Sequence, residues 1–248
     1  MKVSFVIPFH NEENNCSPMV EKVLKYSKSN KLDYEIIPVD DRSSDNTSEI
    51  LKKLAKTYPS VLPVFRKKDR EKKGNTMGKA LIDGTRKAKG EIIIWTMGDL
   101  ADDTKTYGDI IEKVNRGYDM VFGSRYMLGG SRGNLDLLKA SLSSWGTILA
   151  RILFGIPVHD ITNAFRGFKK RVFGKIVLDS SGFSISPEFA IKAHLAGFKL
   201  GEVPTTYANR VEGISSFKLF NMIKSYLSLY FSLFYKHKIL SRPFDFVR

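Results

Sequence analysis

The sequence predicts an α/β fold with a mostly parallel central sheet and helices on both of its faces. Up to residue 125, short apolar runs alternate with longer segments of helical periodicity. This alternation is typical of βαβ units, whose right-handed crossovers cover both faces of the sheet. Charged residues follow the apolar runs, where sheets of this kind bind ligands. At 248 residues and 42% hydrophobic content, the chain can bury one large core.

Five strands and four helices are expected in the first half. The strands are short runs rich in Val, Ile and Phe, which favour pleated, buried backbone. The helices repeat apolar residues three or four positions apart, which places these residues on one face. The expected strands are residues 2–8, 33–41, 61–66, 91–97 and 118–125, and the expected helices are residues 16–29, 47–58, 76–90 and 107–117.

The second half is less regular, but three further elements can be assigned. Residues 135–155 have helical periodicity. A shorter helix over 186–198 opens with Ser-Pro, a common helix start. A strand is expected over 199–207, at an edge of the sheet because Pro204 cannot donate a hydrogen bond to a neighbouring strand.

Residues 217–235 predict a helix that is apolar over most of its surface. Such a helix either packs on protein or lies in a membrane interface, and the basic residues that follow it favour the interface. Lys224 near its centre argues against a membrane span. We therefore divide the chain into a catalytic domain over 1–215 and an interfacial helix and tail over 216–248. The polar residues form one narrow stripe: Lys218, Asn221, Ser225, Ser228 and Ser232.

Charge and composition restrict the possible partners. The net charge of +14 and the pI near 9.7 favour an anionic partner. No aromatic residue interleaves the basic run over 66–74, so we expect no nucleic-acid partner. The single cysteine excludes an internal disulfide framework and indicates a reducing compartment. The four histidines are scattered, and the chain contains no phosphate-loop, dinucleotide-binding or HExxH motif.

Charged side chains stand at the ends of four predicted strands, namely at Glu12, Asp40 or Asp41, Asp99 and Arg125. Parallel strands end at one edge of a sheet, so these residues should meet there. A carboxylate at Asp40 or Asp41 can accept a hydrogen bond from a nucleobase N–H or a ribose hydroxyl. Asp99 is suited to hold a divalent cation between the protein and a diphosphate.

Nearby acidic and amide residues have a structural explanation. Asp45 or Asn46 precedes a predicted helix and is expected to cap it. Asp102 and Asp103 are expected to start the next helix, where the helix dipole favours negative charge, or to border the acceptor.

Six segments together resemble family 2 glycosyltransferases, and among these the polyprenyl-phosphate sugar transferases of the dolichol-phosphate mannose synthase type. The resemblance covers residues 3 to 220 and implies a GT-A nucleotide-diphospho-sugar transferase fold. One such motif would be weak, but six in the family's order are specific. The segments are VIPFHNEE, VDDRSSDNT, GDLADD, GSRY, DITNAFRGF and NRVEGISSFK.

The resemblance implies a role for each matching residue. An acid is common in the family at position 97, where this chain has Met97, so the metal role falls on Asp99 with Mg²⁺ or Mn²⁺ as the cofactor. The catalytic residues implied are Asp99, Arg125 and Arg210. The nucleotide-sugar contacts implied are Pro8, His10, Glu12, Val39, Asp41, Met97, Gly98, Asp99, Arg125 and Arg210. The acceptor-side residues implied are Lys139, Asp160, Arg166, Glu188 and Lys218.

The expected reaction is an inverting transfer of a hexose from a nucleotide-diphospho-sugar, of the GDP-mannose or UDP-glucose type, to a polyprenyl phosphate. A lipid phosphate oxygen is already anionic, so no strong general base is required. Two alternatives stay open: transfer to a glycan hydroxyl in surface-polysaccharide synthesis, and a catalytically silent nucleotide-sugar-binding module. The expected location is the cytoplasmic face of a membrane, where the protein is peripheral and a membrane-anchoring partner subunit is possible.

Overall fold

The central sheet of the protein has seven strands in the order β3-β2-β1-β4-β6-β5-β7. The computed structural model describes residues 1–67, 76–208 and 219–239. All strands are parallel to their neighbours except β6, which is antiparallel to both β4 and β5. The mostly parallel sheet is therefore confirmed. The strands are β1 (Val3–Phe9), β2 (Tyr34–Asp40), β3 (Val64–Phe65), β4 (Ile92–Trp95), β5 (Met120–Ser124), β6 (Arg166–Lys169) and β7 (Leu200–Pro204).

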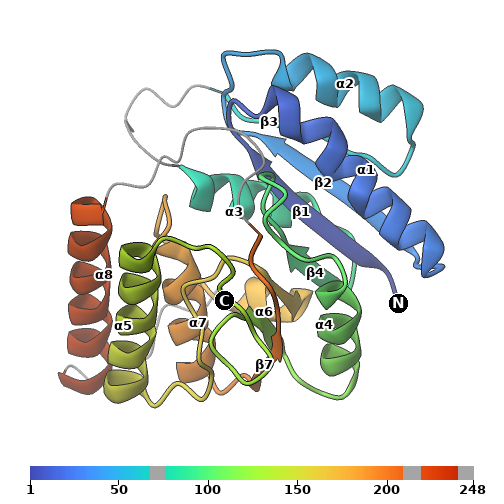
Figure 1. The fold of residues 1–248 in the computed structure, drawn as a ribbon. Coiled ribbons are helices and arrows are strands. Elements are labelled where there is room, and N and C mark those ends of the chain that lie inside the picture. Colours follow the sequence, from blue (N-terminus) through green and yellow to red (C-terminus); the bar gives the residue numbers. More distant parts are fainter. Residues whose placement is uncertain (68–75, 209–218, 240–248) are drawn as a thin grey trace.

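Helices cover both faces of the sheet (Figure 1). Helices α1, α2 and α4 pack on one face, and α3, α5, α7 and α8 pack on the other. The helices are α1 (Glu13–Ser29), α2 (Thr47–Thr57), α3 (Met77–Lys87), α4 (Thr106–Asn115), α5 (Leu137–Phe154), α6 (Lys170–Lys175), α7 (Ile185–Leu195) and α8 (Leu219–Phe234), which continues into a π-helical turn, η1 (Tyr235–Ile239).

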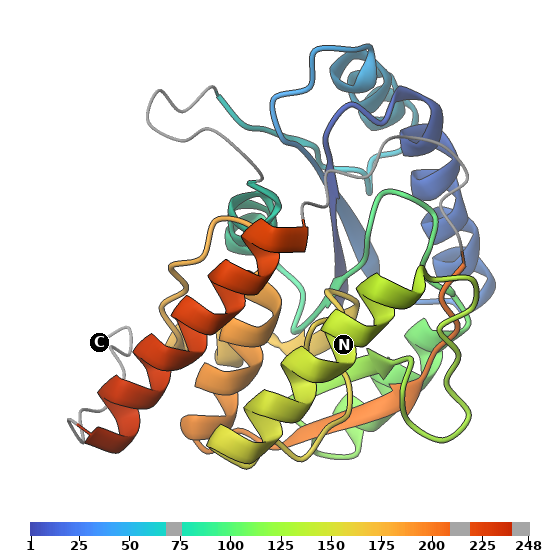
Figure 2. The same cartoon turned by 60° about the vertical axis from the view of Figure 1, so that its left-hand side comes forward.

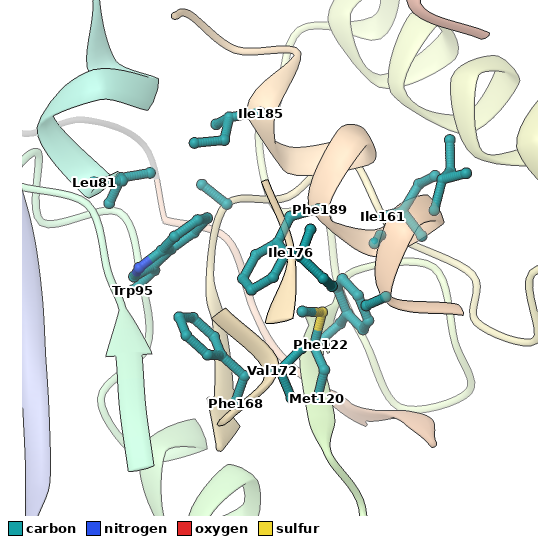
Figure 3. Packing of buried hydrophobic residues seen from close by; sticks show 14 of the residues in the cluster. Leu81, Trp95, Met120, Phe122, Ile161, Phe168, Val172, Ile176, Ile185 and Phe189 are labelled. Atoms are coloured by element: carbon teal, nitrogen blue, oxygen red, sulfur yellow. The ribbon is translucent and has the colours of Figure 1, made fainter. Parts of the chain in front are cut away.

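Two hydrophobic cores result from the alternation of side chains along the strands. In β4, Trp95 faces one core and Ile94 faces the other, because successive strand residues point to opposite faces. The larger core is aromatic where Trp95, Phe168 and Phe189 meet, with ring centroids 4.9–5.2 Å apart (Figure 3). This core joins β4 and β6 to α7 and so fixes the middle of the sheet.

Two strands differ from expectation. Strand β6 was not predicted from its sequence, although the expected motif over 160–168 includes part of it. It pairs with β4 and β5 on its two sides, so its strand conformation depends on both neighbours. Strand β3 has two residues instead of the predicted six, and Pro63, which lacks a backbone N–H, immediately precedes it. The prediction of an edge strand near Pro204 is confirmed, since β7 closes one side of the sheet.

Helix α8 lies beside α5 and runs parallel to it (Figures 1 and 2). The hydroxyl of Tyr230 donates to the backbone oxygen of Gly146 over 3.0 Å. The rings of Tyr230 and Phe234 pack against Phe154, and Leu233 joins the same core. One side of α8 is therefore packed on protein. Among the described residues, α5 is the one helix long and apolar enough to cross a membrane, a test that core helices of soluble proteins also pass.

Candidate active site

The loops that follow β1, β2 and β4 each contain a non-glycine residue in the left-handed backbone region. These residues are Asn11 (φ 54°), Arg42 (φ 63°) and Leu100 (φ 64°). Such conformations are unfavourable for residues with a Cβ and often occur at functional sites. Because the three strands are parallel neighbours, the three loops lie at the same edge of the sheet. Three of the four described non-glycine residues with positive φ therefore lie where the sequence predicts ligand binding; the fourth, Lys31, lies in the turn before β2.

The loops after β1 and β2 are held together by hydrogen bonds. The backbone N–H of Asp41 donates to the oxygen of Phe9 over 2.7 Å, and His10 Nδ1 lies 2.7 Å from the oxygen of Asp41. The backbone N–H of Glu12 donates to Thr47 Oγ1 over 3.0 Å, at the start of α2. These contacts bring together His10, Glu12 and Asp41, as predicted. Pro8 and Val39 are buried and are paired in register between β1 and β2, directly before these loops.

Asp45 links the starts of two helices. Its carboxylate accepts from the backbone N–H of Glu13 in α1 and from that of Thr47 in α2, both over 3.0 Å. Burial opposes ionisation of Asp45, but hydrogen bonds from Thr47 and Glu13 outweigh it and lower the pKa. Asp45 therefore has the predicted helix-start role. Asn46 directly precedes α2, but its side chain makes no capping bond.

Asp40 and Asp41 are both buried at the end of β2, but they contact different partners. Asp40 Oδ1 accepts from the backbone N–H of Ser43 over 3.0 Å, and its other oxygen accepts from Ser48. Asp40 therefore shapes its own loop.

Asp41 lies in a cluster of donors. Its Oδ1 accepts from Arg42 Nε over 3.0 Å and from Arg66, and its Oδ2 accepts from Thr76 Oγ1 over 2.5 Å. Arg66 is held in turn by Asp83 over 2.8 Å. Sequence reasoning missed Arg42, Arg66 and Thr76. Arg42 was adjacent to Asp41 and could have been noticed, whereas Arg66 and Thr76 are 25 and 35 residues away in the chain.

Asp99 is buried in the turn that follows β4. A Cβ added at Gly98 would lie 2.5 Å from the Phe9 ring and 2.8 Å from the Pro8 backbone oxygen, so only glycine allows this close approach to β1. Asp99 Oδ1 accepts from the backbone N–H of Ala101 over 3.2 Å. Gly98 therefore places Asp99 beside the end of β1. Met97 precedes this turn and packs against the larger core.

Asp102 and Asp103 have different roles. Asp103 Oδ1 accepts from the backbone N–H of Lys105 over 3.0 Å, immediately before α4, as predicted. Asp102 instead points back to the strand end and accepts from Thr96 Oγ1 and from the Met97 N–H, each over 2.8 Å. The prediction that Asp102 starts the helix was wrong. Burial, followed by the nearby charge of Asp99, raises the pKa of Asp102 to about 7.

Arg125 follows β5 and is clamped by Asp160. Its Nε and Nη2 donate to the two oxygens of Asp160 over 2.7 and 2.9 Å, and its backbone N–H donates to the same carboxylate. Burial disfavours the guanidinium charge, but Asp160 outweighs burial and raises the pKa of Arg125. Nη2 also donates to Ser143 of α5 over 3.0 Å. Asp160 is fully buried, so it orients Arg125 rather than presenting itself at the surface.

The remaining residues predicted for the acceptor side fall in other environments. Arg166 is fully buried and donates to backbone oxygens, including Ser186 over 2.8 Å, and burial lowers its pKa to about 9. Glu188 is also buried and accepts from the N–H of Ser180 and from Lys192. Contrary to the expectation of an acceptor contact, both side chains fix protein loops.

Three further predicted residues complete the comparison. Lys139 is half-buried in the first turn of α5. Arg210 and Lys218 lie outside the described residues. The chain leading to Arg210 is fixed at Ala208, whose N–H donates to the oxygen of Ala101 over 2.9 Å, two residues beyond Asp99.

Comparison with known proteins identifies the family. The model for glycosyl transferase family 2 matches residues 4–177. A dolichol-phosphate mannosyltransferase of Pyrococcus furiosus is 32% identical over 222 residues, covering 88% of this chain and 60% of the relative. A polyprenol monophosphomannose synthase of Mycolicibacterium smegmatis is 28% identical, covering 85% of this chain and 78% of the relative. The chain therefore spans only 60% of the length of the Pyrococcus relative.

Solved structures with low sequence identity have the same fold. Mannosyl-3-phosphoglycerate synthase from Rubrobacter xylanophilus aligns with a TM-score of 0.68 at 15% identity, covering 96% of this chain and 75% of that one. Glucosyl-3-phosphoglycerate synthase from Mycobacterium tuberculosis was solved with Mn²⁺, UDP and glucosyl-3-phosphoglycerate. It aligns with a TM-score of 0.64 at 16% identity, covering 93% of this chain and 79% of that one. These similarities establish the GT-A fold. Together with the family match over residues 4–177, they lead to one conclusion: the chain belongs to glycosyltransferase family 2.

Proposed function

We propose that this protein transfers a hexose, with inversion, from a nucleotide-diphospho-sugar to a polyprenyl phosphate at a membrane surface. One observation carries the proposal: α5 contributes both to the polar edge and to an exposed apolar surface. Ser143 of α5 accepts from Arg125, while Trp145 and Ile152 of the same helix are exposed. The names of the Pyrococcus and Mycolicibacterium relatives support a polyprenyl phosphate acceptor and a mannosyl group.

The residues present fit a divalent cation that is held only partly by protein. Among the described residues, no group of three or more His, Cys, Asp or Glu side chains could hold a metal ion. Asp99 would be the protein ligand, and diphosphate and water oxygens would complete the coordination, an arrangement that Mg²⁺ and Mn²⁺ accept. The Mn²⁺ in the Mycobacterium tuberculosis structure supports a divalent cofactor. When bound, the cation would neutralise charge on the diphosphate.

The arginines would bind the phosphate groups during transfer. Arg125 keeps its charge and is pre-oriented by Asp160, so little reorganisation is needed when a phosphate binds. Arg210 would assist from the segment that follows Ala208. An oxygen of the acceptor phosphate attacks the anomeric carbon, and the bond from that carbon to the diphosphate breaks with its electron pair leaving on oxygen. The acceptor oxygen is already anionic, so no side chain needs to remove a proton.

The membrane part of the proposal rests on the exposed apolar side chains of the neighbouring helices α5 and α8, here together called the α5–α8 surface. Both helices lie on the same side of the molecule (Figure 2). Large apolar side chains exposed together usually mark a protein or membrane interaction site. Exposed Lys224 suits anionic headgroups. The α5–α8 surface consists of Leu137, Leu138, Trp145, Ile148 and Ile152 of α5, and Phe220, Ile223, Leu227 and Phe231 of α8.

On the basis of this surface, we propose that the protein is peripheral on the cytoplasmic face of a membrane. A membrane-anchoring partner subunit could cover the same residues. Binding of the isolated chain to protein-free vesicles distinguishes the two, because only direct lipid contact would retain it there.

Transfer of labelled sugar tests the reaction. The chain is incubated with Mn²⁺, polyprenyl phosphate and radiolabelled GDP-mannose or UDP-glucose, and label is counted in the organic phase. Asp99→Asn should reduce transfer by about 100-fold or more, because a cation site is lost at the diphosphate. Asp103→Asn is the matched control, because Asp103 only begins α4, and it should retain most of the activity. The absence of label from the organic phase with both donors would refute the polyprenyl acceptor.

A further inference from the structure

The carboxylate of Asp41, which we place at the nucleotide, has few positions left for accepting hydrogen bonds. Oδ1 accepts from both Arg42 and Arg66, and Oδ2 accepts from Thr76. The side chain is only 6% exposed. A carboxylate offers about four lone-pair positions, so these three donors leave about one. The end of β2 therefore presents several donors and little acceptor capacity.

The donors around Asp41 are held in place. Arg66 is fixed between Asp41 and Asp83, with Nε of Arg66 2.8 Å from Asp83 Oδ2. Arg42 itself has a left-handed backbone conformation (φ 63°), and its side chain also donates to Thr76. Withdrawing the Asp41 carboxylate from this cluster would leave an arginine charge without its partner in a mostly buried place, which is costly. The cluster formed by Arg42, Asp41, Arg66 and Thr76 is therefore pre-organised.

The family resemblance leaves two nucleobases open, guanine and uracil. The Asp41 cluster does not fit the two equally well. Guanine presents two neighbouring donor groups, N1–H and the N2 amino group, and one acceptor, O6. Binding both donors at a carboxylate requires two available oxygens. Uracil presents one donor, N3–H, between two carbonyl acceptors, O2 and O4. Among the described residues, none accepts from Arg42 Nη1 or Arg66 Nη2, so each arginine keeps a donor group for a carbonyl.

We infer that the donor substrate is a uridine diphosphate sugar and that the Asp41 cluster selects uracil against guanine. The remaining acceptor position on Asp41 takes N3–H, and the arginine N–H groups donate to the uracil carbonyls. Guanine would need a second acceptor position on the Asp41 carboxylate, but Arg42, Arg66 and Thr76 already donate to the other positions. This inference rests on the proposed function, because that function places the nucleotide at the ends of β1, β2 and β4.

Direct binding tests the inference without the lipid acceptor. UDP and GDP are titrated separately, in the presence of Mn²⁺, into the full chain by isothermal titration calorimetry. We expect UDP to bind at least about 10-fold more tightly, a difference of about 1.4 kcal/mol. Equal binding, or tighter binding of GDP, would overturn the uracil assignment and leave the proposed transferase standing. If neither nucleotide binds, the nucleotide site itself is wrong and the uracil assignment falls with it.

Two variants test whether this cluster sets the preference. Thr76→Val frees Asp41 Oδ2 and should narrow the ratio of GDP to UDP dissociation constants, chiefly by tighter GDP binding. Arg66→Gln should narrow the same ratio chiefly by weaker UDP binding. Arg86→Gln is the control, because Arg86 contacts the same Asp83 but is exposed on α3, and it should leave the ratio unchanged.

Circular dichroism verifies folding of each variant. A variant that merely destabilised the chain would weaken the binding of UDP and of GDP by the same factor. If the ratio is the same in Thr76→Val, Arg66→Gln and the parent chain, the cluster does not read the base.

Discussion

Asp99 and Asp102 both follow β4, yet their surroundings give the two carboxylates different properties. Asp99 lies beside β1 because Gly98 allows close approach, whereas Asp102 is turned back against Thr96 and Met97. Burial raises the pKa of Asp102 to about 7, with Asp99 as the second cause. At the residue scale, one acid is the cation ligand that we propose, and the other holds the turn that positions it.

The raised pKa of Asp102 predicts how stability depends on pH. The ordinary pKa is 3.8, so the native chain binds this proton more tightly than the unfolded chain, and stability contributed here falls as pH rises from about 4 to about 7. Asp102→Asn keeps an oxygen acceptor and removes the charge. In EDTA, we expect the variant to be more stable than the parent chain by about 1–3 kcal/mol at pH 8 and by little near pH 4. Urea unfolding measures the free energy of unfolding of both proteins at each pH. A stability difference that does not depend on pH would contradict the raised pKa of Asp102.

The absence of an acid at position 97 predicts weak metal binding in the free protein. Since Asp99 is the one protein ligand proposed, Mn²⁺ alone should bind at least about 10-fold more weakly than Mn²⁺ in the presence of UDP or GDP. Electron paramagnetic resonance of unbound Mn²⁺ measures both affinities. Asp99→Asn should abolish the increase in Mn²⁺ affinity that the nucleotide causes. Tight binding of Mn²⁺ without nucleotide would mean that further protein ligands exist.

At the scale of elements, α5 and α8 each use different faces for different purposes. Tyr226, Tyr230 and Leu233 of α8 are buried, whereas Phe231 is 74% exposed. Trp145 of α5 is likewise 68% exposed, and Gly146 next to it accepts the hydrogen bond from Tyr230. Each helix thus joins the core by one side and contributes apolar side chains to the α5–α8 surface by another.

The α5–α8 surface can be tested with the protein's own fluorescence. The chain has two tryptophans, of which Trp95 is fully buried and Trp145 is exposed. Vesicles of phosphatidylcholine and phosphatidylglycerol should shift the emission to shorter wavelength, because Trp145 leaves water. Trp145→Phe should remove the shift while vesicle co-sedimentation continues.

Two substitutions at exposed apolar residues complete this test. Phe231→Asp should weaken co-sedimentation by about 10-fold, since it places a charge in the apolar surface. Leu62→Asp is the control, because Leu62 is also exposed but lies between α2 and β3. Equal effects of the two substitutions would show that the α5–α8 surface does not contact lipid.

At the scale of the whole molecule, α8 is part of the larger core. The predicted boundary between residues 215 and 216 falls in a segment that the structure does not describe, but the helix beyond it supplies Tyr230 and Leu233 to that core. Removing residues 216–248 should therefore lower the free energy of unfolding by about 3 kcal/mol or more. Urea unfolding measures the loss, and Phe231→Asp, which changes only an exposed position, should cause little. An unchanged stability after truncation would contradict this view of α8.

The sequence by itself determined the alternation of strands and helices, the acids at strand ends and the position of Asp99, because these depend on periodicity and local order along the chain. Tertiary structure alone decided three other features. Strand β6 forms because β4 and β5 pair with it on both sides. Arg166 became a buried support for backbone oxygens, and Asp41 met Arg66 and Thr76 from distant segments. Burial and hydrogen-bond partners depend on contacts between segments far apart in the chain, and local sequence patterns do not encode those contacts.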